Sequence, residues 1–277
     1  MTAEDRLSLA EAADHLGVHY MTAYRYVRTG QLPARRDGAT WSVATRDIAA
    51  FKKAHAKRSP TRPRRVDRVA RLKGRLIEGD EHGAWMIVES ALASGVEPAE
   101  LYRDVLIPAL VEIGDEWSLG TMSVTEEHRA SAVALRLVGR LGPHFSRRGR
   151  SRGTVIVGAP PGDPHSLPGA FISDLLRAKG FEVIDLGANV PAASFVEASL
   201  AADRRVAVLV GATSPETVAA VRTVTAALHR ANITNVLVGG GAVRDADHAR
   251  TLGADDWTGL DSNGVLAAVE NRATRNH

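Results

Sequence analysis

Asp163 and His165 stand two positions apart, shortly after the apolar run 154–158 (TVIVG). A carboxylate beside an imidazole can hold one ring nitrogen by a hydrogen bond and leave the other free to bind a metal. The two residues are therefore a candidate metal-ligand pair. The same spacing also fits a loop histidine whose hydrogen bond to the aspartate is purely structural, and the pair alone does not separate these interpretations.

Two later loops are rich in small residues where apolar runs end. Residues 211–214 read GATS and residues 238–241 read VGGG. We expect a deep slot there, lined by Thr213, Ser214, Gly239 and Gly240. A nucleotide-phosphate site is the competing interpretation. It is disfavoured because the first turn lacks GxGxxG and the chain lacks GxxxxGK followed by Ser or Thr.

The elements that must position these loops lie in residues 152–277, where short β-branched runs alternate with amphipathic stretches. Expected strands are 154–158, 181–186, 206–210 and 235–238, expected helices are 168–179, 192–202, 215–230 and 243–252, and a last strand and helix follow. This pattern indicates an α/β domain with a doubly wound parallel five-stranded sheet, covered by helices on both faces. Ligands of such sheets bind beyond the carboxyl ends of the strands, where the small-residue loops fall.

Residues 66–146 form a separate helical region. Four helices are expected at 66–77, 81–93, 98–117 and 124–138, with Gly79, Gly95 and Gly120 as breaks. Apolar residues recur at intervals of three and four, so each helix has a core face. Four antiparallel helices with short loops predict a four-helix bundle. An Arg-, Gly- and Ser-rich break at 146–153 separates it from the sheet domain.

Residues 1–59 predict a winged helix-turn-helix. Ser8 and Glu11 have the capping-box spacing, a second short helix begins near Tyr20, and a hairpin wing precedes a third helix at about 46–56. We expect contacts to the DNA groove from Thr22, Arg25, Tyr26 and Arg28, and contacts to phosphates from Arg35 and Arg36 on the wing. Charges merely solvated on a small helical domain are the alternative. The Pro- and Arg-rich residues 60–65 predict a linker.

Charge and composition agree with this division of the 277 residues. Residues 1–65 carry 13 Lys and Arg against 6 Asp and Glu, whereas the remainder carries 22 against 26. A local excess of cations is what phosphate neutralisation needs. The absence of cysteine excludes disulfides, cysteine zinc sites, iron–sulfur clusters and thiol catalysis. No apolar run of eighteen residues and no signal-like start are present, so we expect a cytoplasmic protein without membrane contact.

Two spaced motifs carry a family resemblance. Asp163 and His165 open a loop that is similar to the DxHxxG loop of cobalamin-binding domains. Nine residues separate Trp117 from Glu127-His128, which resembles the W-x9-EH pattern of the helical cap in the same proteins. With the helix-turn-helix, the chain resembles the CarH-type light-sensing cobalamin regulators and, at its N-terminus, the MerR and excisionase type.

This resemblance implies a role for each motif residue. His165 would bind the cobalt of cobalamin as its lower ligand, oriented by Asp163. Trp117, Glu127 and His128 would cover the upper face of the corrin. Thr213, Ser214, Gly239 and Gly240 would accept its nucleotide tail. Adenosylcobalamin is the implied form, and it would favour a DNA-binding oligomer, a dimer or tetramer, that light takes apart.

The chain departs from the family at three positions. Ser118 stands where the family has a histidine that caps cobalt after photolysis, and His128 is the nearest alternative. Pro168 stands where the DxHxxG motif has its glycine, with Gly169 one residue later. Gly211 replaces the serine usual at the start of the third-strand loop. Light sensing is therefore less well supported by the sequence than cobalamin binding.

Together these features predict a transcriptional regulator, a repressor of a double-stranded DNA operator, rather than a conventional enzyme. One alternative is a corrinoid methyl-carrier protein that serves a methyltransferase, although the basic N-terminal region argues against it. Another is a regulator that senses a different ligand or chromophore in the same cleft.

Overall fold

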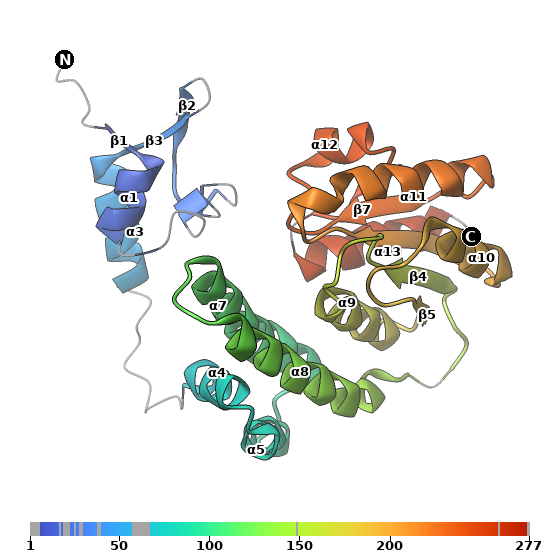
Figure 1. Cartoon of the computed structure of the whole chain (residues 1–277), viewed down its shortest axis with the longest axis horizontal. Coiled ribbons are helices and arrows are strands. Elements are labelled where there is room, and N and C mark those ends of the chain that lie inside the picture. Colours follow the sequence, from blue (N-terminus) through green and yellow to red (C-terminus); the bar gives the residue numbers. More distant parts are fainter. Residues whose placement is uncertain are drawn as a thin grey trace. The chain divides into compact units, whose positions relative to one another are not determined.

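The computed structural model divides the chain into two compact units, Met1–Val66 and Asp67–His277 (Figure 1). It describes residues 6–16, 18, 23–24, 26–27, 30–37, 40–56, 67–147, 149–259 and 261–275. Residues 60–65, where the sequence predicts a linker, lie outside this part.

The first unit combines helices with a small antiparallel sheet. Its elements are β1 (Arg6–Ser8), α1 (Leu9–Leu16), β2 (Arg35–Asp37), β3 (Thr40–Ala44) and α3 (Thr45–Ala56), and the sheet order is β1-β3-β2. The expected capping box is present, because Glu11 N–H donates to Ser8 Oγ and Ser8 N–H donates to Glu11 Oε2. The Ser8 hydroxyl also donates to Glu11 Oε2, and the hydrogen bonds from the Ser8 backbone N–H and hydroxyl lower the pKa of Glu11. The wing hairpin β2–β3 is as expected, whereas the sequence analysis missed β1.

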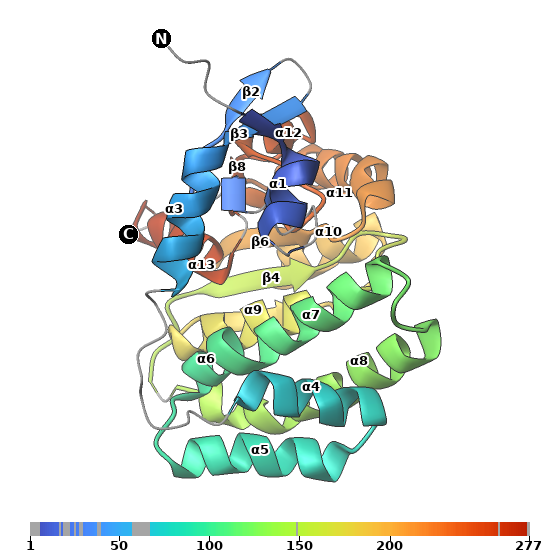
Figure 2. The same cartoon turned by 90° about the vertical axis from the view of Figure 1, so that its left-hand side faces the viewer.

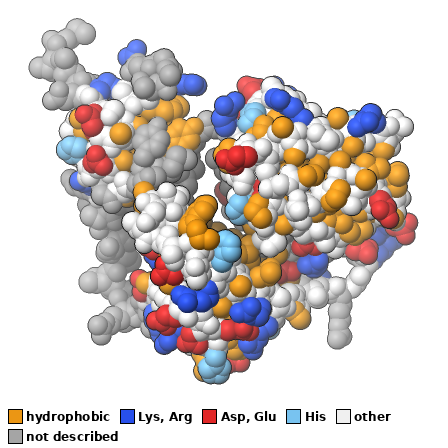
Figure 3. All heavy atoms as spheres, in the orientation of Figure 1, with side chains coloured by type: hydrophobic (Ala, Val, Ile, Leu, Met, Phe, Trp, Pro, Cys, Tyr) orange, Lys and Arg blue, Asp and Glu red, His pale blue; other side chains and the backbone are white. Residues whose placement is uncertain are grey.

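The second unit begins with the helical bundle, whose helices are drawn from cyan to green in Figure 2. They are α4 (Arg68–Glu78), α5 (Glu81–Ala93), α6 (Pro98–Leu101), the π-helical turn η1 (Tyr102–Leu106), α7 (Ile107–Ser118) and α8 (Val124–Leu141). Three N-caps explain the sharp starts, since the side chains of Asp67, Asp80 and Ser123 accept backbone N–H groups at the first turns of α4, α5 and α8. Acidic and basic side chains intermix on the bundle surface (Figure 3).

The helix expected at 98–117 is continuous but contains the turn η1. There the N–H of Ile107 bonds to the carbonyl of Tyr102, five residues back. Pro108 follows and has no N–H to donate, so the regular pattern is interrupted at this point. The turn carries Tyr102, whose side chain is completely buried.

The α/β part contains a five-stranded parallel sheet with the order β5-β4-β6-β7-β8. Its elements are β4 (Thr154–Gly158), α9 (Leu167–Ala178), β5 (Glu182–Asp185), α10 (Ala192–Ala201), β6 (Arg205–Gly211), η3 (Pro215–Thr217), α11 (Val218–Arg230), β7 (Val236–Gly239), α12 (Ala246–Thr251), β8 (Asp256–Trp257) and α13 (Ser262–Arg275). The doubly wound fold predicted from the sequence is confirmed.

Alternate strand residues supply two separate cores, as the pleat of a strand requires. Ile156 packs with α10, α11 and α12 on one face of the sheet. Its neighbours Val155 and Val157 pack with α9 and α13 on the other face. Because both faces are covered, the chain can approach a ligand only at the strand ends and loops.

Helix α9 also joins the bundle to the sheet domain. Its residues Phe171 and Leu175 belong to the bundle core. The hydroxyl of Tyr102 donates to Asp174 Oδ2 at 2.7 Å, and the Tyr102 ring lies 4.7 Å from the rings of Phe145 and Phe171. Burial raises the pKa of Tyr102 far above its ordinary value, with a smaller effect from the Asp174 carboxylate. The phenol therefore stays protonated and acts as the donor.

Candidate functional site at the carboxyl edge of the sheet

The strand order places one candidate loop beside another. Strand β4 lies between β5 and β6, so the chain leaves β4 on one side to form β5 and reaches β6 on the other. This is a topological switch point, where the loops beyond two neighbouring strands diverge and leave a crevice for a ligand. The loop after β4 contains Asp163 and His165, and the loop after β6 contains Thr213 and Ser214.

Asp163 is fully buried and ties these two loops together. Its Oδ1 accepts the backbone N–H of His165 at 3.1 Å and the ring nitrogen Nδ1 at 2.7 Å. Its Oδ2 accepts the backbone N–H of Thr213 at 2.7 Å and that of Ser214 at 3.4 Å. Four donors from two loops therefore converge on one carboxylate, which satisfies a charge that burial would otherwise penalise.

This arrangement determines which nitrogen of His165 is available. An ionised carboxylate only accepts hydrogen bonds, so Nδ1 is the nitrogen that donates to Asp163, and in the neutral ring Nε2 carries the lone pair. The His165 side chain is 44% exposed, although its partner is buried. Ser214 Oγ lies 3.5 Å from the same Nδ1. The imidazole is thus held through Nδ1 and presents Nε2, a nitrogen of the type that binds metals, on the other side.

Asn189, which the sequence analysis missed, shapes the loop that carries Asp163. Its Oδ1 accepts the N–H of Gly162 at 2.8 Å, and its own N–H donates to the carbonyl of Asp163 at 2.8 Å. Its φ is 54°, a left-handed conformation that Asn adopts more readily than most residues. An asparagine in the loop after the second strand was the available signal, but nothing in the sequence connected it with Asp163.

The glycines after β7 have a packing role that the structure makes explicit. A Cβ at Gly239 would collide with the side chain of Thr258, and one at Gly240 would collide with the backbone of Ala212. Gly240 also has a φ of +97°, which disfavours any side chain. Gly240 therefore lets the loops after β6 and β7 approach closely, and Gly239 does the same for the segment after β8. Contact of the two glycines with a nucleotide tail stays a prediction.

The expected cap residues lie in the bundle, around the turn between α7 and α8. Trp117 near the end of α7 is 47% exposed. In the first turns of α8, Glu127 Oε2 bonds to His128 Nδ1 at 2.7 Å, and Glu127 Oε1 accepts Ser131 Oγ at 2.7 Å. The hydroxyl of Ser118 donates to the Asp115 carbonyl. In the described part of the chain, no hydrogen bond or ion pair connects this group with His165.

Only part of the predicted DNA contact set can be placed. Arg35 and Arg36 are exposed on β2, and the Arg36 guanidinium lies 6.0 Å from the Trp41 ring centroid. The Tyr26 ring is partly buried and lies 4.9 Å from the Phe51 ring, so it contributes to the core of this unit. Thr22, Arg25 and Arg28 lie outside the described residues. DNA contact by all six residues stays a prediction.

The described residues contain neither a cluster of metal-ligating side chains nor a membrane-spanning helix. No group of three or more His, Asp or Glu side chains is placed to hold a metal ion, so His165 is a single potential ligand there. No helix in the same part of the chain combines the length and apolar character needed to cross a bilayer.

Comparison with known families agrees with this geometry. Residues 69–141 and residues 153–269 each match a family described as a B12 binding domain, and residues 6–56 match a helix-turn-helix domain. The chain thus consists of an N-terminal helix-turn-helix followed by helical and α/β domains of the B12-binding type. These matches support a cobalamin or corrinoid as its cofactor.

Individual relatives divide between two kinds of protein. The chain is 30% identical over 132 residues to trimethylamine corrinoid protein 1 of Methanosarcina acetivorans, a match that covers 47% of this chain and 61% of that protein. It is 34% identical over 116 residues to the HTH-type transcriptional repressor CarH of Myxococcus xanthus, covering 42% and 38% respectively. Among solved structures, the monomethylamine corrinoid protein of Methanosarcina barkeri has a TM-score of 0.63 at 18% identity, over 72% of this chain and 96% of that one, which shows a shared fold.

Proposed function

We propose that the protein is a cobalamin-dependent transcriptional regulator, a repressor whose cobalamin-binding half controls oligomerisation and, through it, DNA affinity. The observation that carries the proposal is the presence, in one chain, of a helix-turn-helix domain and a B12-binding domain whose His165 is held by a buried carboxylate. A helix-turn-helix would have no use in a carrier that only delivers a methyl group. The protein would act by binding rather than by catalysis.

The donor set at the switch point fits the cofactor. Cobalamin brings four corrin nitrogens to its cobalt, so the protein needs to supply one lower ligand, and the neutral imidazole of His165 would offer the lone pair of Nε2. Asp163 would keep that tautomer by accepting the proton of Nδ1 at 2.7 Å. Thr213 and Ser214 are fixed through the same carboxylate, so the ligand and the predicted tail contacts share one anchor.

Residues of the bundle would face the other side of the corrin. The exposed indole of Trp117 offers a flat apolar surface, and Glu127 and His128 add polar groups one turn into α8. When bound in its adenosyl form, the cofactor would supply a cobalt–carbon bond that light can break. Because residue 118 is serine, His128 is the imidazole of this group that could respond to such a change.

Regulation would follow from the assembly of several DNA-binding units. Single half-sites are weak, and joining two or four in one oligomer raises affinity through effective concentration. The basic character of residues 1–65 supplies the phosphate contacts each unit needs. A cofactor that favours the oligomer therefore favours operator binding, even without touching the DNA.

The second candidate is a corrinoid methyl carrier. Its support is specific, since the relative at 30% identity and the structure with a TM-score of 0.63 are both named as methylamine corrinoid proteins. The first match covers 47% of this chain, and the second, at 18% identity, carries fold information alone. The two candidates differ in whether cobalamin changes DNA binding.

The test measures cobalamin binding, oligomeric size and DNA binding on the same full-length protein. The chain is incubated in the dark with adenosylcobalamin, and its visible spectrum, its sedimentation and its retention of the DNA upstream of its own gene are recorded before and after illumination. We expect binding in the dark, a larger oligomer and tighter DNA binding than in the cofactor-free chain. Loss of these properties in light would add a photoreceptor role.

A matched pair of variants makes the result specific. His165→Ala should lower cobalamin affinity by about tenfold or more and remove the cofactor's effect on DNA. His229→Ala removes a histidine from α11 that also pairs with an aspartate, Asp255, and should change neither property. Cobalamin binding with no effect on DNA or size would favour the carrier. Unchanged cobalamin binding in His165→Ala would rule out the proposed ligand.

A further inference from the structure

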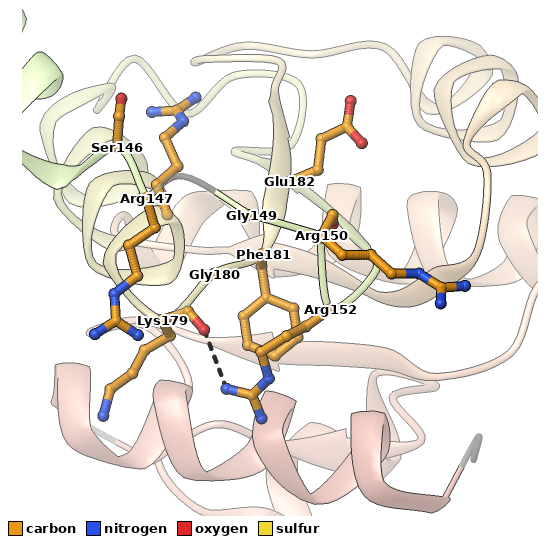
Figure 4. A pocket seen from close by; sticks show the side chains of 11 residues that line it. Ser146, Arg147, Gly149, Arg150, Arg152, Lys179, Gly180, Phe181 and Glu182 are labelled. Atoms are coloured by element: carbon orange, nitrogen blue, oxygen red, sulfur yellow. Dashed lines mark hydrogen bonds between the residues drawn. The ribbon is translucent and has the colours of Figure 1, made fainter.

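A cavity of about 450 Å³ lies at the amino edge of the sheet, with arginines in both segments that line it, 146–152 and 177–182 (Figure 4). Of these side chains, Arg147 and Arg150 point to opposite sides of the cavity. The described arginines of the lining therefore do not converge on one ligand. The helical bundle, in contrast, contains polar contacts that bear directly on the proposed cofactor site.

The cap residues Trp117, Glu127 and His128 lie in a stretch of the bundle with little core contact. The structure describes every residue from 114 to 129, and among them only Met122 is buried. The stretch comprises the last turn of α7, the turn that follows it and the first turns of α8. Apolar packing therefore contributes little to the position of these two helix ends, and polar contacts have a larger share.

Helix α4 packs against both α7 and α8 (Figure 2), and its Lys73 holds the end of α7. Lys73 Nζ lies 3.1 Å from Glu112 Oε2 and 2.5 Å from Glu116 Oε1, and the lysine side chain is only 19% exposed. Burial opposes the charge, but the hydrogen bonds to Glu116 and Glu112 outweigh it and raise the pKa of Lys73. A half-buried cation shared by two carboxylates forms a network, which contributes more than an isolated surface ion pair.

Glu116 connects this network to the cap, because it directly precedes Trp117 in α7. The Glu116 carbonyl also accepts the N–H of Thr121 at 3.0 Å and the Thr121 hydroxyl at 2.9 Å. These two bonds close the turn after α7. Lys73 therefore holds the residue on which both the position of the indole and the path of the turn depend.

Arg129 ties the start of α8 to the C-terminal end of α4. Its Nε donates to the carbonyl of Ile77 at 2.7 Å. Carbonyls in the last turn of a helix lack a partner within the helix, and an arginine side chain can satisfy them. Gly79 makes room for this contact, since a Cβ there would lie 2.7 Å from Arg129 Cδ. Because Arg129 directly follows Glu127 and His128 in α8, its bond fixes the helical turn that carries them.

We propose that Lys73 and Arg129 are positioning residues for the upper side of the cofactor site. Through them α4 holds the end of α7 and the start of α8, and thereby the backbone positions of Trp117, Glu127 and His128, whose side chains stay free to adjust. Binding sites need such supporting contacts to keep their geometry. The inference rests on the proposed function, because these cap residues meet a cofactor only if the chain binds cobalamin.

The first test measures the surroundings of Trp117 without any cofactor. The full-length chain is labelled with 5-fluorotryptophan at its four tryptophans, and the fluorine resonance of Trp117 is assigned by its absence from Trp117→Phe. In Lys73→Met/Arg129→Gln we expect this resonance to shift or broaden, because the end of α7 is released. The resonance of Trp257, which lies in the sheet, should stay unchanged.

A matched control removes one cation from each of the same two helices. In Arg75→Met/Arg136→Gln, the lost partners are acidic side chains near the end of α4 and Glu81 of α5, so the contacts of α4 with the ends of α7 and α8 remain. We expect the Trp117 resonance of this control to match the wild type. Lys73→Arg keeps a cation that two carboxylates can share and should also leave the resonance in place. If the double variant does not fold, Lys73→Met alone gives the same comparison.

The second test compares two forms of the cofactor on the same variants. Adenosylcobalamin has a large upper ligand and hydroxocobalamin a small one, so a displaced cap should affect the adenosyl form more. We expect Lys73→Met/Arg129→Gln to bind adenosylcobalamin at least about threefold more weakly than the wild type and the control do, a size typical of coupled contacts. Its affinity for hydroxocobalamin should be unchanged, because His165 is untouched.

An unchanged Trp117 resonance in Lys73→Met/Arg129→Gln would overturn the proposal. The same shift in the control would also overturn it, since the loss of charge would then be the cause. A shifted resonance with unchanged adenosylcobalamin affinity would contradict a positioning role toward the cofactor. If the wild type binds no cobalamin, the proposed function fails, whereas the resonances recorded without cofactor still decide whether Lys73 and Arg129 hold Trp117.

Discussion

The residues predicted to bind the cofactor include two carboxylate–histidine pairs, Asp163–His165 and Glu127–His128. The two pairs differ in how the surrounding protein holds them. In both pairs the carboxylate oxygen lies 2.7 Å from Nδ1 of the histidine. The Asp163 side chain is 0% exposed and that of His165 is 44% exposed, whereas the values are 26% for Glu127 and 75% for His128. Asp163 collects donors from two loops, while the second pair depends on neighbours within a single helix.

Because of this difference in burial and hydrogen bonding, His165 is preorganised, whereas His128 can change its position. A buried carboxylate with four donors cannot move without leaving polar groups unsatisfied, so His165 is fixed before any cofactor arrives. An exposed pair on the first turns of a helix loses little when its hydrogen bond breaks. This contrast suits a lower ligand that stays in place and an upper face that changes with the state of the cofactor.

The largest effect is expected from breaking the buried pair. Asp163→Ala removes the acceptor of the Thr213, Ser214 and His165 N–H groups and should destabilise the cofactor-free protein by about 3 kcal/mol. Glu127→Ala, the matched change in the exposed pair, should cost about 0.5 kcal/mol or less. Urea unfolding measures the free energy of unfolding of each variant. Similar losses of stability in Asp163→Ala and Glu127→Ala would show that the two pairs are held equally firmly.

A third carboxylate, Asp174, extends the comparison. Tyr102→Phe removes one donor from this buried group and leaves the bond from Arg177 in place. We expect a loss of about 2 kcal/mol, since hydrogen bonds to charged groups contribute more than neutral ones. Thr223→Ala, which removes an exposed hydroxyl bonded within α11, is the control and should change the urea midpoint little. A negligible effect of Tyr102→Phe would show that the junction rests on apolar packing alone.

The exposed pair should matter for the cofactor more than for folding. His128→Ala is expected to change dark cobalamin affinity by less than about tenfold, because the lower ligand is untouched. The His128→Ala substitution should alter the visible spectrum of the cobalamin-bound protein after illumination, if His128 takes the place of the histidine missing at position 118. An unchanged illuminated spectrum would exclude His128 from that role, with His165→Ala as the positive control for a spectral change.

The smallest effect is expected beside the exposed pair, at the capping box of α8. Hydrogen bonds from the Ser123 hydroxyl and backbone lower the pKa of Glu126. Because the folded pKa lies below the unfolded one, the ionised carboxylate stabilises the protein above its ordinary pKa, and this contribution is lost as the pH falls through the folded value. The stability difference between wild type and Glu126→Gln should therefore be full at neutral pH and disappear in acid, below about pH 4.

Unfolding midpoints across that pH range test this prediction. Ser123→Ala removes the hydroxyl donor but keeps the backbone N–H that also donates to Glu126 Oε2, so it should lose only part of the same pH-dependent increment. A difference between wild type and Glu126→Gln that persists in acid would assign the effect to helix propensity, which does not titrate.

Much of the fold could be predicted from patterns local in the chain. The alternation of β-branched runs and amphipathic stretches predicted all five strands and their helices, because burial on both faces of a parallel sheet requires apolar runs. Strand β1 was missed because its three residues form a strand only by pairing with β3, which is remote in sequence. The π-helical turn was missed because a proline inside an apolar helix signals an interruption but not its form.

The sequence predicted which side chains form the candidate site, but not the hydrogen bonds from other loops that hold them in place. The spacing of Asp163 and His165 indicated their hydrogen bond, since residues two apart in a loop can reach each other. The donors from Thr213 and Ser214 could not be predicted, because they depend on β4 and β6 being neighbours. The packing of Gly239 against Thr258 and of Gly240 against Ala212 likewise requires the sheet order.

The amino-acid sequence by itself determined the element types, the basic character of the N-terminal region and the identity of the candidate ligand, since periodicity, charge and side-chain chemistry are properties of short segments. Only the tertiary structure decided that Asp163 is buried among four donors, that Tyr102 joins Asp174 across 72 positions, and that arginines from two segments surround one cavity. Contacts between remote segments arise from the packing of whole elements, and no local pattern encodes them.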